Sequence, residues 1–467
     1  MKKHLVLLTL LLVAGIIVIS PAQTWTVEQI TDNAEDDIFP FATRVPSGFM
    51  VVYTHFDGDN ESFVASNTGG SWTTSRVTDN SRSDIGFDIA SRPGQTDVHI
   101  ALWWNDVPDG EISYTSGGMS GWDTERVTDD ADDDAWPSIE IDQNGFAHMV
   151  YQKNTGGDLE VFYSNNVTGG SPWPFEQVTD NATADGFPWL ALDSGNNPHI
   201  VFTDGAQLFY TKKTAGIWTT PNPIFGGFGT NSFPYLVLDR DDNVHICYAK
   251  SDGVDNEIYY ANNVTGDWQE SKVTSNDYHD YYPTLLVDAA GKVHIAYQDN
   301  EADAEIFYAN NVSGVWDFVR VTDNSVSDAV ALGQYFITDG QGHGNIFFWN
   351  NSDGDDEIYV ARSNQPIIAG IEEVAPVATL AINLDQTVFS NTNTIRYSIT
   401  RDGNVTIKVF DASGSLVETL VNGPKSAGEH TVNWNGETDA GVKASPGVYF
   451  LHLTAAGKTA SVKAVLK

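Results

Sequence analysis

The chain has 467 residues, of which 41% are hydrophobic and 12% aromatic. This is enough for two domains with a buried core each, and it excludes a chain that is disordered throughout. The 63 acidic and 24 basic residues give a net charge of −39, which argues against nucleic acid as a partner because the phosphate backbone would be repelled.

Residues 1–22 have the pattern of a secretory signal peptide. Lys2 and Lys3 precede an apolar run over residues 5–19, and the small residues Ser20 and Ala22 follow it. A retained membrane anchor is the alternative, although the run is short for a span. The single cysteine, Cys247, excludes a disulfide framework, and we expect it to be a small core residue. The sequence therefore predicts export, with a fold stabilised by packing alone.

A repeat of about fifty residues fills most of the chain. Tryptophans recur at intervals of 45 to 51 residues, at positions 25, 72, 122, 173, 218, 268 and 316. This period indicates a propeller or a solenoid. Each unit contains four short segments rich in Val, Ile, Tyr, Phe and Thr, which is the content of one propeller blade. We therefore predict an all-β chain with a seven-bladed β-propeller over residues 23–363.

The two ends of the repeat predict how the ring closes. The Trp-containing segment 24–31 has no unit before it, and the last unit, ending at residues 357–363, lacks such a segment. The N-terminal strand should therefore complete the last blade and leave no open sheet edge. The repeat length resembles that of secreted sialidase-like and kelch-like propellers. Their sequence signatures are absent, so this resemblance implies a fold and no function.

Residues 364–376 have the composition of a linker, and residues 377–467 alternate like a small Ig-like β-sandwich. The tail contains the segments Val409–Asp411, Gly428–His430, Trp434–Gly436 and Pro446–Tyr449, together with Asp439, Lys463 and Lys467. On these residues it resembles the Ig-like domain of the flagellar hook-cap (FlgD) type and type IX secretion sorting domains. Where many relatives have Asn-Pro-Phe-Asn-Pro, this chain has Phe389–Asn393. The resemblance implies contact with a secretion machinery and then surface attachment or removal of the tail; a plain spacer is the alternative.

Acidic residues gather in two sets of loops. Because neighbouring strands alternate in direction, the loops that join consecutive blades lie on the same face as those between the second and third strands of a blade. Two turns place carboxylates at alternate positions, which suits Ca²⁺. Their residues are Asp57, Asp59 and Glu61, and Asp353, Asp355 and Glu357. The alternative is that Asp and Asn only shape these turns.

Two further sets of residues recur from blade to blade. The histidines 99, 148, 199, 245 and 294 occupy equivalent places, where a buried, hydrogen-bonded role competes with a metal ring. Aromatic residues precede proline in five blades, at positions 39, 136, 187, 233 and 282, and Phe87 has the matching place in another. They are either wedges between blades or platforms for sugar rings.

Departures from the repeat point to a site. The segment Tyr278–Tyr282 and the pair Trp103–Trp104 stand out on the acidic side, so the candidate ligand-binding residues are Trp104, Trp136, Tyr278, His279 and Tyr282. In an enzyme, His279 with Tyr278 and Asp280 would supply acid–base catalysis; an ordinary exposed loop is the alternative. Because near-identical blades suit binding better than catalysis, we expect a secreted or cell-surface binding or scaffold protein for glycans or proteins. A lyase or hydrolase acting on polysaccharides is the first alternative, and a purely structural envelope protein is the second.

Overall fold

A computed structural model describes residues 23–105, 109–226, 233–301, 303–352, 354–368, 381–384, 387–390, 392–399, 403–411, 414–425, 428–455 and 458–467. The expected signal peptide and most of the expected linker lie outside these ranges. Within them the chain forms strands and turns only, so no described segment is a helix long and apolar enough to cross a membrane. The predicted all-β fold class is confirmed.

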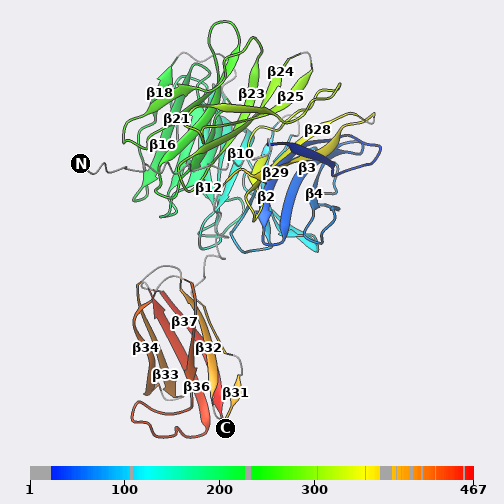
Figure 1. Ribbon diagram of the computed structural model, residues 1–467. Helices are drawn as coiled ribbons and strands as arrows, with labels where there is room; N and C mark the ends of the chain where they lie inside the picture. The colour runs from blue at the N-terminus through cyan, green and yellow to red at the C-terminus, as the bar shows by residue number, and fades with distance from the viewer. Residues whose placement is uncertain are drawn as a thin grey trace, which may run out of the picture.

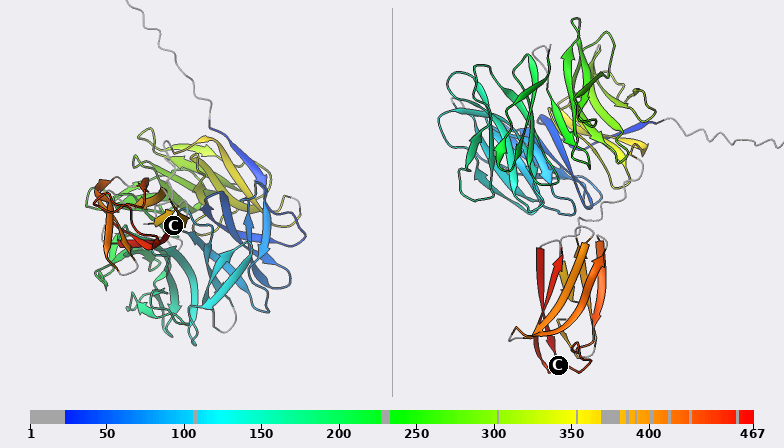
Figure 2. Two further views of the ribbon diagram at one scale, coloured as in Figure 1. Left: turned by 90° about the horizontal axis from the view of Figure 1, so that it is seen from below. Right: turned by 90° about the vertical axis from the view of Figure 1, so that its left-hand side faces the viewer.

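The described residues between 25 and 366 form seven antiparallel sheets around a common axis (Figures 1 and 2). The first three sheets contain β2 (Asp37–Val45), β3 (Gly48–Phe56), β4 (Asn60–Ser66) and β5 (Thr73–Arg76); β6 (Asp84–Ser91), β7 (Val98–Trp104), β8 (Glu111–Gly118) and β9 (Gly121–Arg126); and β10 (Asp133–Ile141), β11 (Ala147–Asn154), β12 (Leu159–Asn165) and β13 (Phe175–Gln177).

The next three sheets contain β14 (Gly186–Leu192), β15 (Pro198–Thr203), β16 (Gln207–Thr214), β17 (Ile217–Trp218) and β18 (Asn222–Gly226); β19 (Tyr235–Leu238), β20 (Val244–Ser251), β21 (Asn256–Asn262) and β22 (Gln269–Lys272); and β23 (Asp280–Val287), β24 (Val293–Asn300), β25 (Ala304–Asn310) and β26 (Asp317–Arg320). The seventh combines both ends of the repeat: β27 (Phe336–Thr338), β28 (His343–Asn350), β29 (Glu357–Pro366) and β1 (Trp25–Gln29). Strand β1 pairs with β29 from Trp25 opposite Ser363 to Gln29 opposite Tyr359. Strand β29 also reaches three residues into the stretch expected as a linker.

Four of the seven sheets pack on the next through a repeated Asp–His–Tyr–Trp contact, and the second sheet has the same contact without the Asp. In the fifth sheet His245 lies between the Asp239 carboxylate (3.3 Å from Nε2) and the Tyr260 hydroxyl (2.6 Å from Nδ1), and the Tyr260 ring packs edge-on against Trp316 of the sixth sheet. The histidines 148, 199 and 294 have equivalent Asp and Tyr neighbours, and His99 has the Tyr. The recurring tryptophans therefore join successive sheets, and the recurring histidines are hydrogen-bonded core residues.

The inner strand of most sheets has a β-bulge at its aromatic–proline pair. The register shifts there in β2, β10, β14 and β23, and the same shift occurs around Phe87 in β6, where Asp88 takes the place of the proline. The aromatic residue before each of these four prolines, and Phe233 before Pro234, has a positive φ between 36° and 57°. The five residues are Phe39, Trp136, Phe187, Phe233 and Tyr282. A bulky side chain rarely adopts this conformation, so packing must hold it in place.

The C-terminal residues form a sandwich of two sheets (Figure 1). One contains β30 (Ala381–Leu384), β32 (Asn393–Ile399) and β35 (Gly428–Trp434); the other contains β31 (Val388–Phe389), β33 (Gly403–Asp411), β34 (Leu416–Lys425), β36 (Gly447–Ala455) and β37 (Lys458–Leu466). Trp434 is 1% exposed and lies between Phe389 and Tyr449, with ring centroids 5.3 and 5.0 Å away. The core of the sandwich contains only residues of this part of the chain.

Candidate ligand-binding face

The two sets of acidic loops lie on one face, as their hydrogen bonds show. The Asp37 N–H donates to the Asp356 carbonyl at 2.6 Å, and the Asn256 N–H donates to His279 Nδ1 at 3.0 Å. We call this the acidic face. Its described loops between consecutive sheets are 30–36, 77–83, 127–132, 178–184, 273–279 and 321–327. Its described loops within sheets are 57–59, 105 with 109–110, 155–158, 204–206, 252–255, 301 with 303, and 351–352 with 354–356.

Many carboxylates of this face are buried in a repeated network. Glu160, the second residue of β12, accepts the Thr179 hydroxyl at 2.5 Å and the Asn181 N–H at 2.9 Å. The Asn181 amide then donates to Asp185 at 2.6 Å. In six of the seven sheets this glutamate accepts a backbone N–H from the loop that enters the next sheet; the six are Glu61, Glu111, Glu160, Glu257, Glu305 and Glu357, all at most 6% exposed. The network fastens consecutive sheets together, and each of these carboxylates already accepts at least one hydrogen bond from the chain.

The chain supplies cations to this network itself. Arg76 contacts Glu61 (2.9 Å), Asp79 (3.1 Å) and Asp57 (3.3 Å). Arg320 contacts Glu305, Glu301 and Asp323 in the same way, at 2.9 to 3.5 Å. Part of the repulsion expected among these carboxylates is therefore relieved by guanidinium groups on the outer strands.

The predicted calcium ligands fall into this arrangement. Asp57 and Glu61 contact the Arg76 guanidinium, and Asp59 is half-buried beside them. In the second turn Glu357 is buried and accepts the Asn33 N–H at 2.5 Å, Asp355 is half-buried, and Asp353 lies outside the described residues. Neither set forms a group of carboxylate oxygens at metal-ligand spacing among the described residues, so their metal-binding role stays a prediction.

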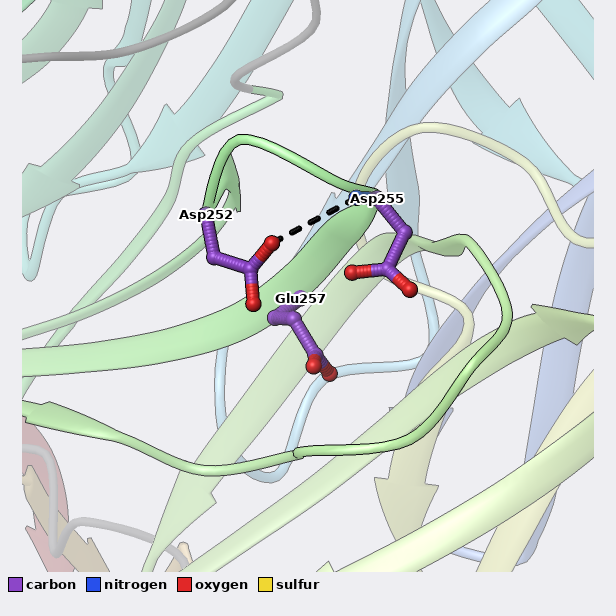
Figure 3. Close-up of side chains that lie close together, drawn as sticks. All are labelled: Asp252, Asp255 and Glu257. Atoms are coloured by element: carbon purple, nitrogen blue, oxygen red, sulfur yellow. Dashed lines mark hydrogen bonds between the residues drawn. The ribbon is translucent and has the colours of Figure 1, made fainter.

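One acidic group at that spacing is found in the described chain, in the related turn of the fifth sheet. Oxygens of Asp252, Asp255 and Glu257 lie within 4.8 Å of one another (Figure 3). Asp252 is exposed, whereas Asp255 is 5% and Glu257 1% exposed. Burial, and then the neighbouring Asp252, raise the pKa of Asp255. The sequence shows this turn as one of several acidic turns, and its spacing did not distinguish it from them.

The candidate acid–base residues do not form one site. Asp280 is 0% exposed and accepts the Asn276 amide at 3.2 Å, and that amide also donates to Asp299 at 3.3 Å. His279 and Tyr278 are exposed instead; His279 accepts the Asn256 N–H and stacks on Tyr281. Burial, which is the main cause, raises the pKa of Asp280 to about 8. The three consecutive side chains thus point into different surroundings.

A series of aromatic residues lies at the beginnings of the inner strands on this face. Edge-to-face or tilted contacts, with centroids 4.9 to 5.3 Å apart, link Phe87, Trp136, Phe187, Phe233 and Tyr282 in series. We call this series the aromatic collar. Beside it is an apolar pocket of about 100 Å³ lined by Phe39, Phe41, Ile85, Phe87, Trp103, Trp136 and Leu332. Trp104 lies outside the collar, with the guanidinium groups of Arg82 and Arg126 about 5 Å from its ring.

Comparison with known proteins bears mainly on the tail. Residues 386–459 match the FlgD Ig-like domain family. No curated protein matches the chain in sequence. Three solved structures resemble it at low identity. An oligogalacturonate lyase from Vibrio parahaemolyticus is 10% identical, covering 73% of this chain and 97% of that one (TM-score 0.49). A fungal alcohol oxidase is 11% identical, covering 95% and 99% (TM-score 0.47). PorZ, a surface component of the type IX secretion system of Porphyromonas gingivalis, is 9% identical, covering 92% and 70% (TM-score 0.35). These three resemblances carry no argument about activity; the C-terminal part of the chain contains an Ig-like domain of the FlgD type.

Proposed function

We propose that this chain is an extracellular binding protein whose acidic face receives a positively charged segment of another protein. The observation that supports this is a set of exposed carboxylates in the loops of that face and at the beginning of β10. They are Asp32, Glu35, Asp36, Asp57, Asp79, Asp129, Asp130, Asp133, Asp180, Asp252, Asp277, Glu301 and Asp323. Such a field attracts and orients a cationic partner.

The apolar pocket beside the aromatic collar supplies an anchor point. Its volume of about 100 Å³ is well below the roughly 300–1,000 Å³ of small-molecule sites, so it suits a single aliphatic side chain. Rings of the collar contact one another edge-on, and the Trp104 ring already carries two guanidinium groups. Neither arrangement leaves a free flat platform for a sugar, and this favours a protein ligand over a glycan.

The polysaccharide-acting alternative has weaker support. It needs a proton donor and acceptor that both reach a substrate. Tyr278 and His279 are exposed, but the neighbouring carboxylate of Asp280 is buried and hydrogen-bonded to Asn276.

The FlgD-type domain supports a role for the tail in delivery. We propose that it directs export through a secretion machinery and holds the chain at the cell surface, as its family resemblance implies. Divalent cations, Ca²⁺ first among them, are proposed as additional counter-ions of the acidic face.

The test measures binding of the purified chain to three kinds of ligand. They are basic peptides that contain a leucine, sequence-scrambled acidic peptides, and the glycans of an array. Basic peptides should bind, with an affinity that falls as salt rises. Leu332→Trp, which fills the pocket, should weaken binding, and Leu192→Trp serves as a control outside the pocket lining. Selective glycan binding, or cleavage of a polysaccharide, would contradict the proposal.

A further inference from the structure

The fifth sheet differs from the first and the sixth in how the carboxylates beside its outer strand are neutralised. In the first and sixth sheets a guanidinium contacts three carboxylates, from Arg76 and from Arg320. The fifth sheet has Lys272 at this place. Its ammonium contacts Asp252 at 2.9 Å and Glu257 at 3.0 Å, and no contact with Asp255 is found.

Asp255 is therefore left with an unused oxygen inside the turn. Asp255 is only 5% exposed, and its Oδ1 atom has no hydrogen-bond partner among the described residues. Figure 3 shows the Asp255 and Asp252 carboxylates turned toward each other above Glu257. A buried carboxylate oxygen without a partner is costly, and two carboxylates face each other here.

The charge of this turn indicates what would complete it. Three carboxylates and one ammonium leave two negative charges, which one divalent cation balances. We propose that the turn between β20 and β21 binds a divalent cation through Asp252, Asp255 and Glu257, beside the Lys272 ammonium. This site lies in a different turn from the two that the sequence singled out.

Ca²⁺ fits the donor set best. All three side chains offer hard oxygen ligands, and the exposed position of Asp252 allows water to fill the remaining places of a flexible shell. The nearby imidazole of His279 uses Nδ1 to accept the Asn256 N–H, so this nitrogen is not free to bind Zn²⁺. Mg²⁺ is disfavoured because it demands a near-ideal octahedral shell.

The test is a Ca²⁺ titration of the full chain by calorimetry, with Tb³⁺ luminescence sensitised by the neighbouring tyrosines as a second readout. The chain should bind Ca²⁺ in the millimolar range or tighter. Asp255→Asn should weaken binding at least about tenfold, since ligand charge sets affinity in such sites. Asp303→Asn, the same change in the equivalent turn of the sixth sheet, is the matched control and should leave the titration unchanged.

Lys272→Gln provides an independent check. If the ammonium shares the two carboxylates with the cation, its removal should tighten Ca²⁺ binding, because the site then carries three uncompensated charges. Melting curves in chelator establish that each variant folds. No saturable binding to the unaltered chain, or equal Ca²⁺ affinity of the unaltered chain and Asp255→Asn, would overturn the site.

Discussion

At the residue scale, the Asp–His–Tyr contacts have the geometry of a proton relay but serve packing. His245 is 2% exposed, and burial, as the main cause, lowers its pKa. Its neighbour Tyr260 is 7% exposed, so no substrate can reach the hydroxyl. The Asp–His–Tyr contacts therefore join the turn between the first and second strands of a sheet to the third strand of the same sheet.

Tyr260→Phe tests this role. The change removes the hydroxyl 2.6 Å from His245 Nδ1 and keeps the ring against Trp316. We expect the free energy of unfolding to fall by about 1–2 kcal/mol, because a buried nitrogen loses its partner. Urea unfolding measures it, with Tyr259→Phe on the other side of the strand as the control. An effect no larger than that of the control would mean that the contact contributes nothing to stability.

A second residue-scale prediction concerns Asp88, which is 2% exposed and accepts the N–H groups of Ile89 (2.8 Å) and Ile139 (2.9 Å). Burial, which outweighs these hydrogen bonds, raises its pKa to about 7. The folded chain therefore retains a proton that the unfolded chain loses above pH about 4. This contribution to stability is fully present below pH about 4 and is lost as pH rises toward 7.

Asp88→Asn should remove that contribution to the pH dependence. The free energy of unfolding of the unaltered chain should fall more steeply between pH 4 and 7 than that of the variant, by up to about 1.4 kcal/mol per pH unit. Denaturant unfolding at several pH values measures the slopes. Asp180→Asn, at an exposed position, controls for the change in net charge. Parallel curves for Asp88→Asn and the unaltered chain would show that Asp88 is ionised throughout.

At the element scale, closure of the ring depends on one short strand. Strand β1 covers the edge of β29, Thr31 accepts the Ile358 N–H at 2.9 Å, and Trp25 packs on Tyr308 of the sixth sheet with centroids 5.4 Å apart. Removing residues 23–31 should expose the β29 edge, which favours aggregation.

We expect this truncation to lower Tm by at least about 5 °C and to produce oligomers, since it removes the pairing and the Trp25 contact together. Calorimetry and size-exclusion chromatography measure the two effects. Removing residues 23 and 24 alone should have little effect on either. A truncated chain that stays monomeric with an unchanged Tm would show that the ring does not need β1.

The sequence predicted the elements better than the use of their side chains. The Trp spacing and the two incomplete ends predicted antiparallel sheets and the pairing of Trp25 with the last strand, because both follow from local pattern. The burial of Glu61 and Glu357 could not be predicted in this way. It depends on Arg76, from another strand, and on the Asn33 N–H, from a loop between sheets. For the same reason the sequence did not show that the Asp280 carboxylate is buried, and its acid–base role stays a prediction.

At the scale of the whole molecule, charge separates the two parts of the chain. From Glu372 onward there are nine acidic and eight basic residues, so the propeller carries nearly all of the net charge of −39. Charge on the acidic face is divided further, between buried carboxylates that join the sheets and exposed ones in the loops. Neutralising the exposed carboxylates should therefore alter binding far more than folding.

The tail should be dispensable for folding and necessary for delivery. Its core, built around Ile395, Trp434 and Leu451, draws on no residue of the propeller, and the seventh sheet is completed by β1. Deleting residues 377–467 should leave the melting transition of the propeller within a few degrees of its position in the full chain. Surface display should be lost, and labelling of intact cells together with blotting of the medium measures it.

The core variant Trp434→Ala gives an independent check. Such a change costs about 3–5 kcal/mol in a packed core, so it should unfold the sandwich alone and abolish display as the deletion does. A deletion variant that fails to fold would make the tail part of the propeller fold, and one that reaches the surface at normal levels would refute the delivery role.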